Sequence, residues 1–304
     1  MRLIPMDARG LVVARHRRHV TVENDAGERH QCALLRRQLK PLVGDEVDWR
    51  RQADGKGVVT GVAPRHTVLT RIDGRGRRED VAANLTQLLV VAAPVPSPDW
   101  TLLDRYLVAA ELIPVKAVIV FNKLDLVNAE PEPLQDLHKI GYRVCRTSAM
   151  LGSGLGHVAT VMARERGAVV GQSGTGKSSL INALLGEQLQ AVGRLTEKGR
   201  HGRHTTSAAT LYRLGNGGEL IDSPGVRNYA PYIESAAEIE RGFREFHPHL
   251  GNCRFDDCRH LAEPDCAVKA ELASGGISPR RYESYEKLYD LVATLHARPS
   301  NKGG

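Results

Sequence analysis

The sequence has no apolar run long enough to cross a bilayer. Its longest runs, such as LLVVAAPV, fall far short of the roughly 20 apolar residues that a membrane-spanning helix needs. The first ten residues, MRLIPMDARG, also lack the hydrophobic region of a secretory signal peptide. Hydrophobic residues make up 41% of the 304 residues, a value typical of soluble globular proteins. We therefore expect a cytoplasmic protein of two or three domains with no membrane partner.

Cysteine is also scarce, with five residues in the chain. Cys32 and Cys145 stand alone, and we expect them to be small core residues. The other three, Cys253, Cys258 and Cys266, fall within fourteen residues. This clustering indicates a metal site more than the disulfide framework of a secreted domain.

Positive charge is concentrated near the N-terminus. The net charge of the chain is +7, and residues 1–80 hold 17 Lys+Arg against 11 Asp+Glu, so the remainder is nearly neutral. Such a distribution is typical of a protein that binds a polyanion, most simply nucleic acid. An ordinary solvated surface is the alternative.

The pattern of apolar residues divides the chain into three domains. Residues 1–64 contain short β-type runs and no helical period, which predicts a small RNA-binding barrel of OB type or an SH3-like barrel. Within residues 65–230, the first part (about 65–80) is expected to be a charged linker. The rest alternates apolar strands with amphipathic helices, which predicts a mostly parallel α/β sheet covered on both faces. Residues 231–304 are expected to be helical.

A glycine-rich stretch predicts a phosphate-binding loop. It matches G-x-x-x-x-G-K-[ST] between an apolar strand and a helix. The glycines allow backbone N–H groups to approach phosphate oxygens, Lys177 is expected to reach the β- and γ-phosphates, and Ser178 to bind Mg²⁺. The expected nucleotide contacts of this stretch are Gly171, Gln172, Ser173, Gly174, Thr175, Gly176, Lys177, Ser178 and Ser179.

A second motif predicts that the base is guanine. Asn122-Lys123-x-Asp125 follows the apolar run VIVF. A carboxylate at Asp125 can accept both N–H donors of guanine, a pair that adenine does not offer. Asn122 can join this loop to the phosphate loop, and the Lys123 stem can lie on the base. After the next strand, backbone N–H groups of Ser148 and Ala149 are expected to meet guanine O6.

Two further segments predict switch regions. Asp222-Ser223-Pro224-Gly225 (switch II) follows an apolar strand, so Asp222 can hold Mg²⁺ through water and the Gly225 N–H can meet the γ-phosphate. The polar segment 202–206 (switch I) precedes it, and Thr205 or Thr206 is expected to bind Mg²⁺ in the triphosphate state.

Val226 stands where many GTPases have a glutamine that orients water. We therefore expect slow intrinsic hydrolysis unless another group positions the water. The candidates in the chain are His201, His204 and, ranked first, His247.

The base motif precedes the phosphate loop, an order that resembles the circularly permuted GTPases. Permutation changes the connectivity and can leave the site intact. As a result, switch II leads directly into the C-terminal domain, and hydrolysis is expected to act on that domain.

The cysteine cluster is completed by a histidine, in the pattern Cys253-x4-Cys258-x-His260-x5-Cys266. Three thiolates and one imidazole form a closed tetrahedral Zn²⁺ shell with no open position for catalysis. We expect one structural zinc ion.

Almost the whole chain resembles the bacterial ribosome small subunit-dependent GTPase A family. The similar segments are PLVGDEVDW, VAANLTQLLVVAAP, GRHTTSAATLYRL, IDSPGV and CRFDDCRHLAEPDCAV. One departure is Thr175, where valine is usual. The resemblance implies a late maturation factor that binds 16S rRNA and the 30S subunit in the GTP state, hydrolyses GTP on stimulation by the subunit, and dissociates as GDP forms.

Three other functions are compatible with parts of the sequence. They are an RNA-binding protein that only senses GTP and GDP, a translation or signalling GTPase, and an ATPase, the last disfavoured by Asp125. A monomer is the expected oligomeric state.

Overall fold

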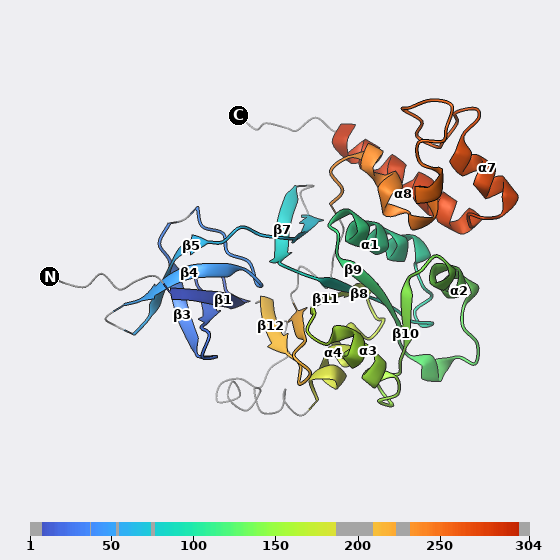
Figure 1. The fold of residues 1–304 in the computed structure, drawn as a ribbon. Helices are drawn as coiled ribbons and strands as arrows, with labels where there is room; N and C mark the ends of the chain where they lie inside the picture. The colour runs from blue at the N-terminus through green and yellow to red at the C-terminus, as the bar shows by residue number, and fades with distance from the viewer. Residues whose placement is uncertain are drawn as a thin grey trace.

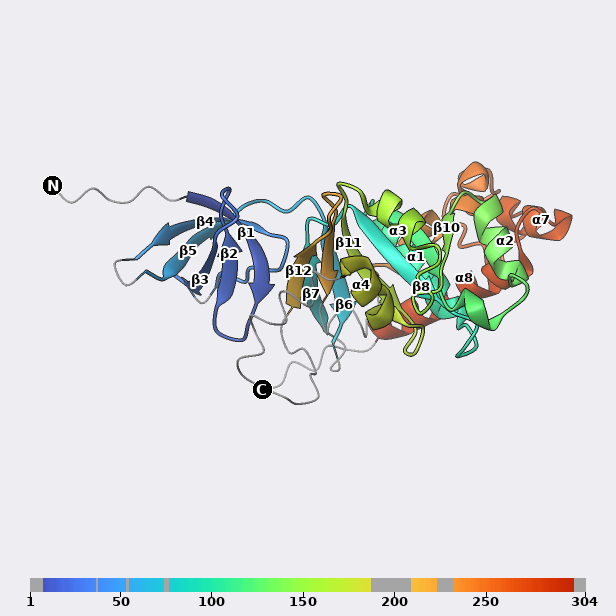
Figure 2. The same cartoon turned by 90° about the horizontal axis from the view of Figure 1, so that it is seen from below.

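The computed structural model describes residues 8–36, 38–52, 55–73, 77–186, 209–222 and 232–297. Three parts follow one another in space: a β-barrel, an α/β core, and a helical C-terminal part that carries α7 and α8 (Figure 1). Figure 2 shows them in a row, with the α/β core in the middle. Among the helices in these ranges, none has the length and apolar character needed to span a membrane.

The barrel is closed by strands in the order β1-β2-β3-β5-β4, with β4 returning to β1. Its strands are β1 (Ala8–Arg15), β2 (Val20–Glu23), β3 (Arg29–Leu34), β4 (Glu46–Arg51) and β5 (Gly57–Val62). The pair β3–β5 is parallel and the other pairs are antiparallel. This Greek-key order is that of the OB type, so the prediction is confirmed and the SH3-like alternative is removed. Cys32 lies in the barrel core, as expected, and burial raises the pKa of its thiol to about 11.

Part of the expected linker is a β-hairpin. Strands β6 (Val68–Ile72) and β7 (Arg78–Ala83) pair antiparallel in a sheet of their own. The charges that indicated a linker are paired across the hairpin, since Arg71 Nη2 lies 2.7 Å from Glu79 Oε2. Leu69 and Ala82 are fully buried in the main core. Residues 68–72 and 78–80 of the expected charged linker therefore form regular strands, in which apolar positions alternate with the charges.

The α/β core contains six strands in the order β10-β9-β8-β11-β13-β12, parallel except for β12. They are β8 (Gln87–Ala92), β9 (Lys116–Phe121), β10 (Arg143–Arg146), β11 (Arg166–Gly171), β12 (Ala209–Arg213) and β13 (Glu219–Asp222). The helices are α1 (Trp100–Leu112), α2 (Glu132–Lys139), α3 (Leu155–Met162), α4 (Lys177–Leu185) and the short 3₁₀ helix η1 (Leu124–Leu126).

Helices cover both faces of this sheet (Figure 1). Side chains of β8 alternate between the two faces, so Leu88 and Val90 pack in the cluster with α1 and α2. Leu89 and Val91 pack in the cluster with α3 and α4. This arrangement confirms the predicted doubly covered, mostly parallel sheet.

The C-terminal part packs on α1. It comprises η3 (Ala236–Gly242), η4 (Arg244–His249), α7 (Ala267–Ser274) and α8 (Pro279–Ala297). Phe243, Phe246 and Tyr285 form its centre together with Val108 of α1. Buried ion pairs between α8 and Asp104 complete the contact with α1.

Candidate functional site

The phosphate loop joins β11 to α4 and depends on glycine at two close approaches. Gly171 has φ +140°, and a Cβ there would lie 2.2 Å from Val91 O. Gly176 has φ +87°, and a Cβ there would lie 2.4 Å from Asn122 Nδ2. Any side chain at either position would collide with fixed atoms and would also strain the backbone. The fold therefore requires glycine at both positions of the loop, as the motif predicted.

Lys177 holds its ammonium inside the curve of this loop. The side chain is 8% exposed, and Nζ donates to Gly171 O and Gln172 O, both at 2.7 Å. Ser178 and Ser179 follow at the start of α4 and are exposed. The N-terminus of α4 thus presents a positive charge and hydroxyl groups together, which suits phosphate and a bound cation.

Asn122 links three loops that are distant in the sequence. Its buried amide donates from Nδ2 to Thr175 O at 3.0 Å, which ties the base motif to the phosphate loop. Oδ1 accepts hydrogen bonds from Thr147 Oγ1 at 3.2 Å and from the Ala149 N–H at 3.0 Å. Base motif and phosphate loop are thus adjacent although the phosphate loop comes later in the chain.

Lys123 also belongs to this arrangement. Its backbone is left-handed, with φ +61°, and Nζ donates to Val95 O at 2.8 Å and to Gly174 O at 2.7 Å. The stem therefore crosses from the base motif to the phosphate loop. Asp125 lies on η1 and is exposed, so its carboxylate is accessible to a base.

The expected O6 contacts are already engaged within the protein. The Ser148 N–H donates to Ser153 O at 3.0 Å, and the Ala149 N–H donates to Asn122 Oδ1. A guanine O6 could accept from these N–H groups only by sharing them with Ser153 O and Asn122 Oδ1 or by replacing those oxygens.

Asp222 is the last residue of β13, which lies beside the phosphate-loop strand β11, and its side chain is buried. The remaining residues expected in the switch regions lie outside the described ranges: Thr205, Thr206, Ser223, Pro224, Gly225, Val226, His201 and His204. His247 lies in η4 of the C-terminal part, where its Nε2 is 2.8 Å from Arg241 O.

Cys253, Cys258, His260 and Cys266 form a compact cluster, with their ligand atoms within 4.8 Å of one another. The imidazole Nδ1 lies 3.5, 3.5 and 3.3 Å from the three sulfurs in that order, and the Cys253 and Cys266 sulfurs are 3.8 Å apart. A tetrahedral Zn²⁺ ion requires S···S distances of about 3.8 Å and S···N distances of about 3.6 Å. The cluster therefore has the size and the donor set for this ion.

The surroundings fix the histidine ligand. His260 Nε2 lies 3.0 Å from Glu240 Oε2, so Nε2–H donates to the carboxylate and Nδ1 is left to face the sulfurs. Tyr282 Oη donates to the His260 carbonyl. Glu240 lies thirteen residues before the first cysteine, and nothing in the spacing of the motif signals it.

Gln172 is a second contact that the motif does not reveal. Its Oε1 accepts from the Asp99 N–H at 3.0 Å, and its Nε2 donates to Ser97 O at 3.2 Å. Asp99 is the N-cap of α1, where its side chain accepts from the Leu102 N–H. The phosphate loop is therefore attached to the start of α1.

Comparison with known proteins relates the chain to one family. The RsgA GTPase family profile matches residues 62–231. A small ribosomal subunit biogenesis GTPase RsgA from Chromohalobacter salexigens is 45% identical over 90% of this chain and 83% of its own length. The protein of that name from Haemophilus influenzae (strain PittGG) is 39% identical over 93% of this chain and 85% of its own.

Two solved structures have the same fold. YjeQ from Thermotoga maritima aligns with a TM-score of 0.74 and 31% identity, covering 95% of this chain and 99% of that one. YloQ, described as a circularly permuted GTPase, aligns with a TM-score of 0.72 and 23% identity, covering 97% and 98%. The permuted order that the motifs predicted is thus confirmed, and the chain belongs to the RsgA GTPase family.

Proposed function

We propose that this protein hydrolyses GTP to GDP and phosphate during maturation of the small ribosomal subunit. The observation that carries the proposal is the Asn122 amide, which joins a guanine-type motif to a phosphate loop in a permuted GTPase core. The relatives named small ribosomal subunit biogenesis GTPase, with 45% and 39% identity over most of the chain, support the choice of partner.

The geometry of the loops supports the following nucleotide roles. Asp125 selects guanine, and the backbone of residues 171–176 surrounds the phosphates. Lys177 neutralises the β- and γ-phosphates from its position inside the loop. Ser178 would bind Mg²⁺ directly and Asp222 would hold it through water. Bound there, the ion would supply positive charge that stabilises the phosphate groups during hydrolysis.

Residues in the segments outside the described ranges complete the proposed nucleotide site. Thr205 or Thr206 adds a Mg²⁺ ligand in the triphosphate state, and the Gly225 N–H meets the γ-phosphate. The Val226 side chain cannot hydrogen-bond to water, so GTP hydrolysis is slow until another group positions the attacking water. His247 is one candidate for that group, and its present hydrogen bond to a carbonyl would have to be exchanged.

The three domains divide the remaining tasks. Residues 1–64 bind 16S rRNA, residues 65–230 bind the nucleotide, and residues 231–304 carry one structural zinc ion on Cys253, Cys258, His260 and Cys266. RNA binding in the GTP state is followed by hydrolysis and release. A monomer in the cytoplasm is sufficient for this cycle.

Binding to the barrel is best tested by point variants. Val13 and Val43 of the barrel segment pack in the same cluster as Ile221 of β13, so removing residues 1–64 would also open the GTPase core. Substitution of exposed basic residues such as Arg17 and Arg18 avoids this damage. Affinity for the subunit should then fall, and its dependence on salt should become weaker, because fewer counterions are released.

The deciding experiment measures GTP hydrolysis at fixed salt with and without purified 30S subunits. ATP and Lys177→Ala are the controls. We expect a large stimulation that is specific for GTP and absent in the variant. GTP binding without stimulation would instead identify an RNA-binding protein that senses nucleotide, a role with which Val226 is compatible.

A further inference from the structure

The barrel and the GTPase core share a continuous sheet. The first half of β1, up to Leu11, pairs with β4 and closes the barrel, whereas Ala14 and Arg15 pair with Thr210 and Ala209 of β12. The β1–β2 register shifts between Val12 and Ala14, which marks a bulge at the point where β1 passes from one partner to the other. A bulge bends a strand and redirects its side chains.

Beside the bulge, β1 packs on both of its faces. Val12 faces the barrel core, and the next residue, Val13, lies in the main core of the GTPase with Leu211 of β12 and Ile221 of β13. Neighbouring residues of one strand therefore belong to the cores of two domains. The barrel cannot turn on the GTPase core without exposing Val13.

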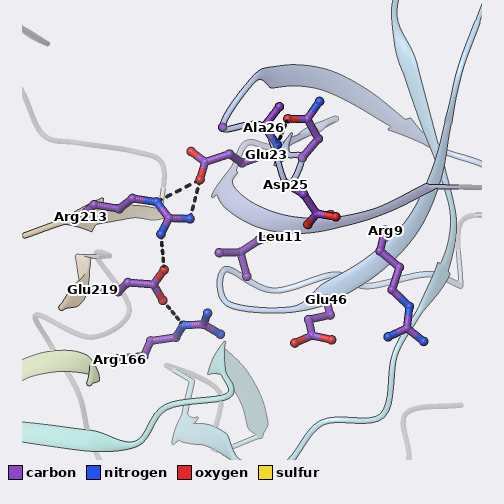
Figure 3. Close-up of a pocket in the computed structure, with 12 residues that line it drawn as sticks. Arg9, Leu11, Glu23, Asp25, Ala26, Glu46, Arg166, Arg213 and Glu219 are labelled. Atoms are coloured by element: carbon purple, nitrogen blue, oxygen red, sulfur yellow. Dashed lines mark hydrogen bonds and ion pairs between the residues drawn. The ribbon is translucent and has the colours of Figure 1, made fainter. Parts of the chain in front are cut away.

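A chain of ion pairs crosses the same junction, beside a cleft of about 680 Å³ (Figure 3). Arg213, the last residue of β12, donates from Nε to Glu23 Oε1 of the barrel at 3.0 Å and lies 3.0 Å from Glu219 of β13. Glu219 in turn binds Arg166 of β11 at 2.6 Å, and Arg166 Nη1 donates to Gly44 O at 3.0 Å. The chain thus begins and ends on residues that precede the GTPase core.

Among the ion-paired groups at this junction, Glu23 depends most on its partners. Its side chain is 6% exposed, and it binds one arginine from each side of the junction, Arg29 of the barrel and Arg213 of the GTPase core. A buried carboxylate that loses a partner keeps its charge in a poorly solvated place, which is unfavourable. The position of β12 relative to the barrel is therefore fixed by charge as well as by backbone pairing.

Strand β12 occupies a particular place in the GTPase. It begins at Ala209, three residues after Thr206, and its other edge pairs with β13, which ends in Asp222. Both expected switch regions are thus attached to β12 or to its neighbour. A displacement of β12 would therefore act on the barrel along one edge and on the residues expected to bind Mg²⁺ along the other.

We propose that Arg213 is a positioning residue that couples the barrel to the nucleotide site through β12, so that RNA on the barrel and the γ-phosphate influence each other. The proposal rests on the proposed function in taking RNA as the partner of the barrel. Coupling of this kind is reciprocal. If the γ-phosphate strengthens RNA binding, RNA strengthens binding of the triphosphate by the same free energy.

The test compares Arg213→Gln with Arg29→Gln in the full-length protein. Both variants remove one arginine from Glu23, and the two side chains have similar exposure, 54% and 48%. Only Arg213 crosses the junction, so Arg29→Gln is the matched control. Arg213→Lys retains the charge and should keep part of the coupling.

The first measurement is amide hydrogen exchange with GDP or a non-hydrolysable GTP analogue, without ribosomes. We expect the analogue to change exchange in β1 and β2 of the wild type and of Arg29→Gln by at least about threefold, and Arg213→Gln to lose this change. An unchanged β1 in the wild type, or a full response in Arg213→Gln, would overturn the proposal.

The second measurement is hydrolysis with saturating 30S subunits. Arg213→Gln should lower the stimulated rate about three- to tenfold and leave the basal rate unchanged, with Arg29→Gln close to the wild type. If Arg213→Gln and Arg29→Gln lose stimulation equally, the coupling is not carried by Arg213. A wild type that 30S subunits fail to stimulate would refute the proposed function, and the exchange measurement would still decide the coupling.

Discussion

The strongest prediction concerns the buried charges that hold the C-terminal part on α1. Arg281 of α8 is 1% exposed, and it binds Asp104 of α1 at 2.7 Å and Glu245 of η4 at 2.6 Å. Arg280 binds the other oxygen of Asp104 at 2.6 Å. Burial alone would lower the pKa of Arg281, but Asp104 and Glu245 outweigh it and raise the pKa, so the guanidinium stays charged. Two cations and two anions therefore balance in this cluster.

Asp104→Asn removes one negative charge without changing the size of the side chain. The cluster then carries a buried, uncompensated positive charge, which typically costs about 3–5 kcal/mol. For a chain of 304 residues each kcal/mol lowers the melting temperature by about 1.6 °C, so we expect a fall of roughly 5–8 °C. Thermal unfolding followed by circular dichroism, with zinc release followed by a colorimetric chelator, measures the effect on the whole chain and on the C-terminal part.

The matched comparison is the double variant Asp104→Asn/Arg280→Gln. It restores neutrality and removes an arginine whose Nε and Nη2 are buried without a hydrogen-bond partner. The double variant should therefore be more stable than Asp104→Asn by more than about 1 kcal/mol. A loss below about 1 kcal/mol for Asp104→Asn alone would refute the reasoning, since Glu245 would then be sufficient to hold the charge of Arg281.

Three other predictions follow from single groups. Asp125→Asn should weaken GTP binding about 10- to 100-fold and favour xanthosine triphosphate, as measured by nucleotide titration; an unchanged base preference would contradict the base assignment. Glu240→Gln should weaken zinc binding about 10- to 100-fold in competition with a chelator, whereas the neighbouring Glu238→Gln should not. Burial would raise the pKa of Glu23, but its arginine partners lower it overall, so its stabilising effect is complete above about pH 4.3 and lost on acidification. The stability difference between the wild type and Arg213→Gln should therefore narrow below that pH in denaturant titrations.

Local rules were sufficient for the motifs and for the sheet. Residues 88–92 are apolar throughout because β8 is buried on both faces, and this pattern is visible in the sequence. The phosphate loop could be predicted because its glycines are required by close approaches to the Val91 backbone and to the Asn122 side chain. In each case the requirement falls on residues that are close together in the sequence or that have a fixed spacing.

Contacts between distant segments were beyond the reach of such rules. Neither Glu240 nor the contact of Gln172 with the start of α1 is marked by sequence spacing, since their partners are set by how η3 and α1 pack. The hairpin of β6 and β7 was interpreted as a linker because its charges are conspicuous in sequence, while their pairing partners appear only in the fold. The OB order likewise depends on which strand closes on β1, a long-range choice.

The packing also changes how the GTPase cycle is best understood. The order of the motifs suggests that switch II acts on the C-terminal part to which it leads. In the fold, however, that part is held on α1 by Arg281, and Arg244 adds a second bond at 2.7 Å to Glu111 near the end of the same helix. Moving the C-terminal part away from α1 would separate buried charges, which is costly.

The start of α1 is in turn bound to Gln172 of the phosphate loop. The helix spans 13 residues, or about 20 Å at 1.5 Å per residue, and connects the phosphate loop to the C-terminal part that carries the Cys/His cluster. We therefore expect α1, α8 and the zinc cluster to move as one body. The C-terminal part would then respond to the bound nucleotide through α1. The Asp104→Asn protein should still bind GTP, but its C-terminal part should no longer respond to the nucleotide.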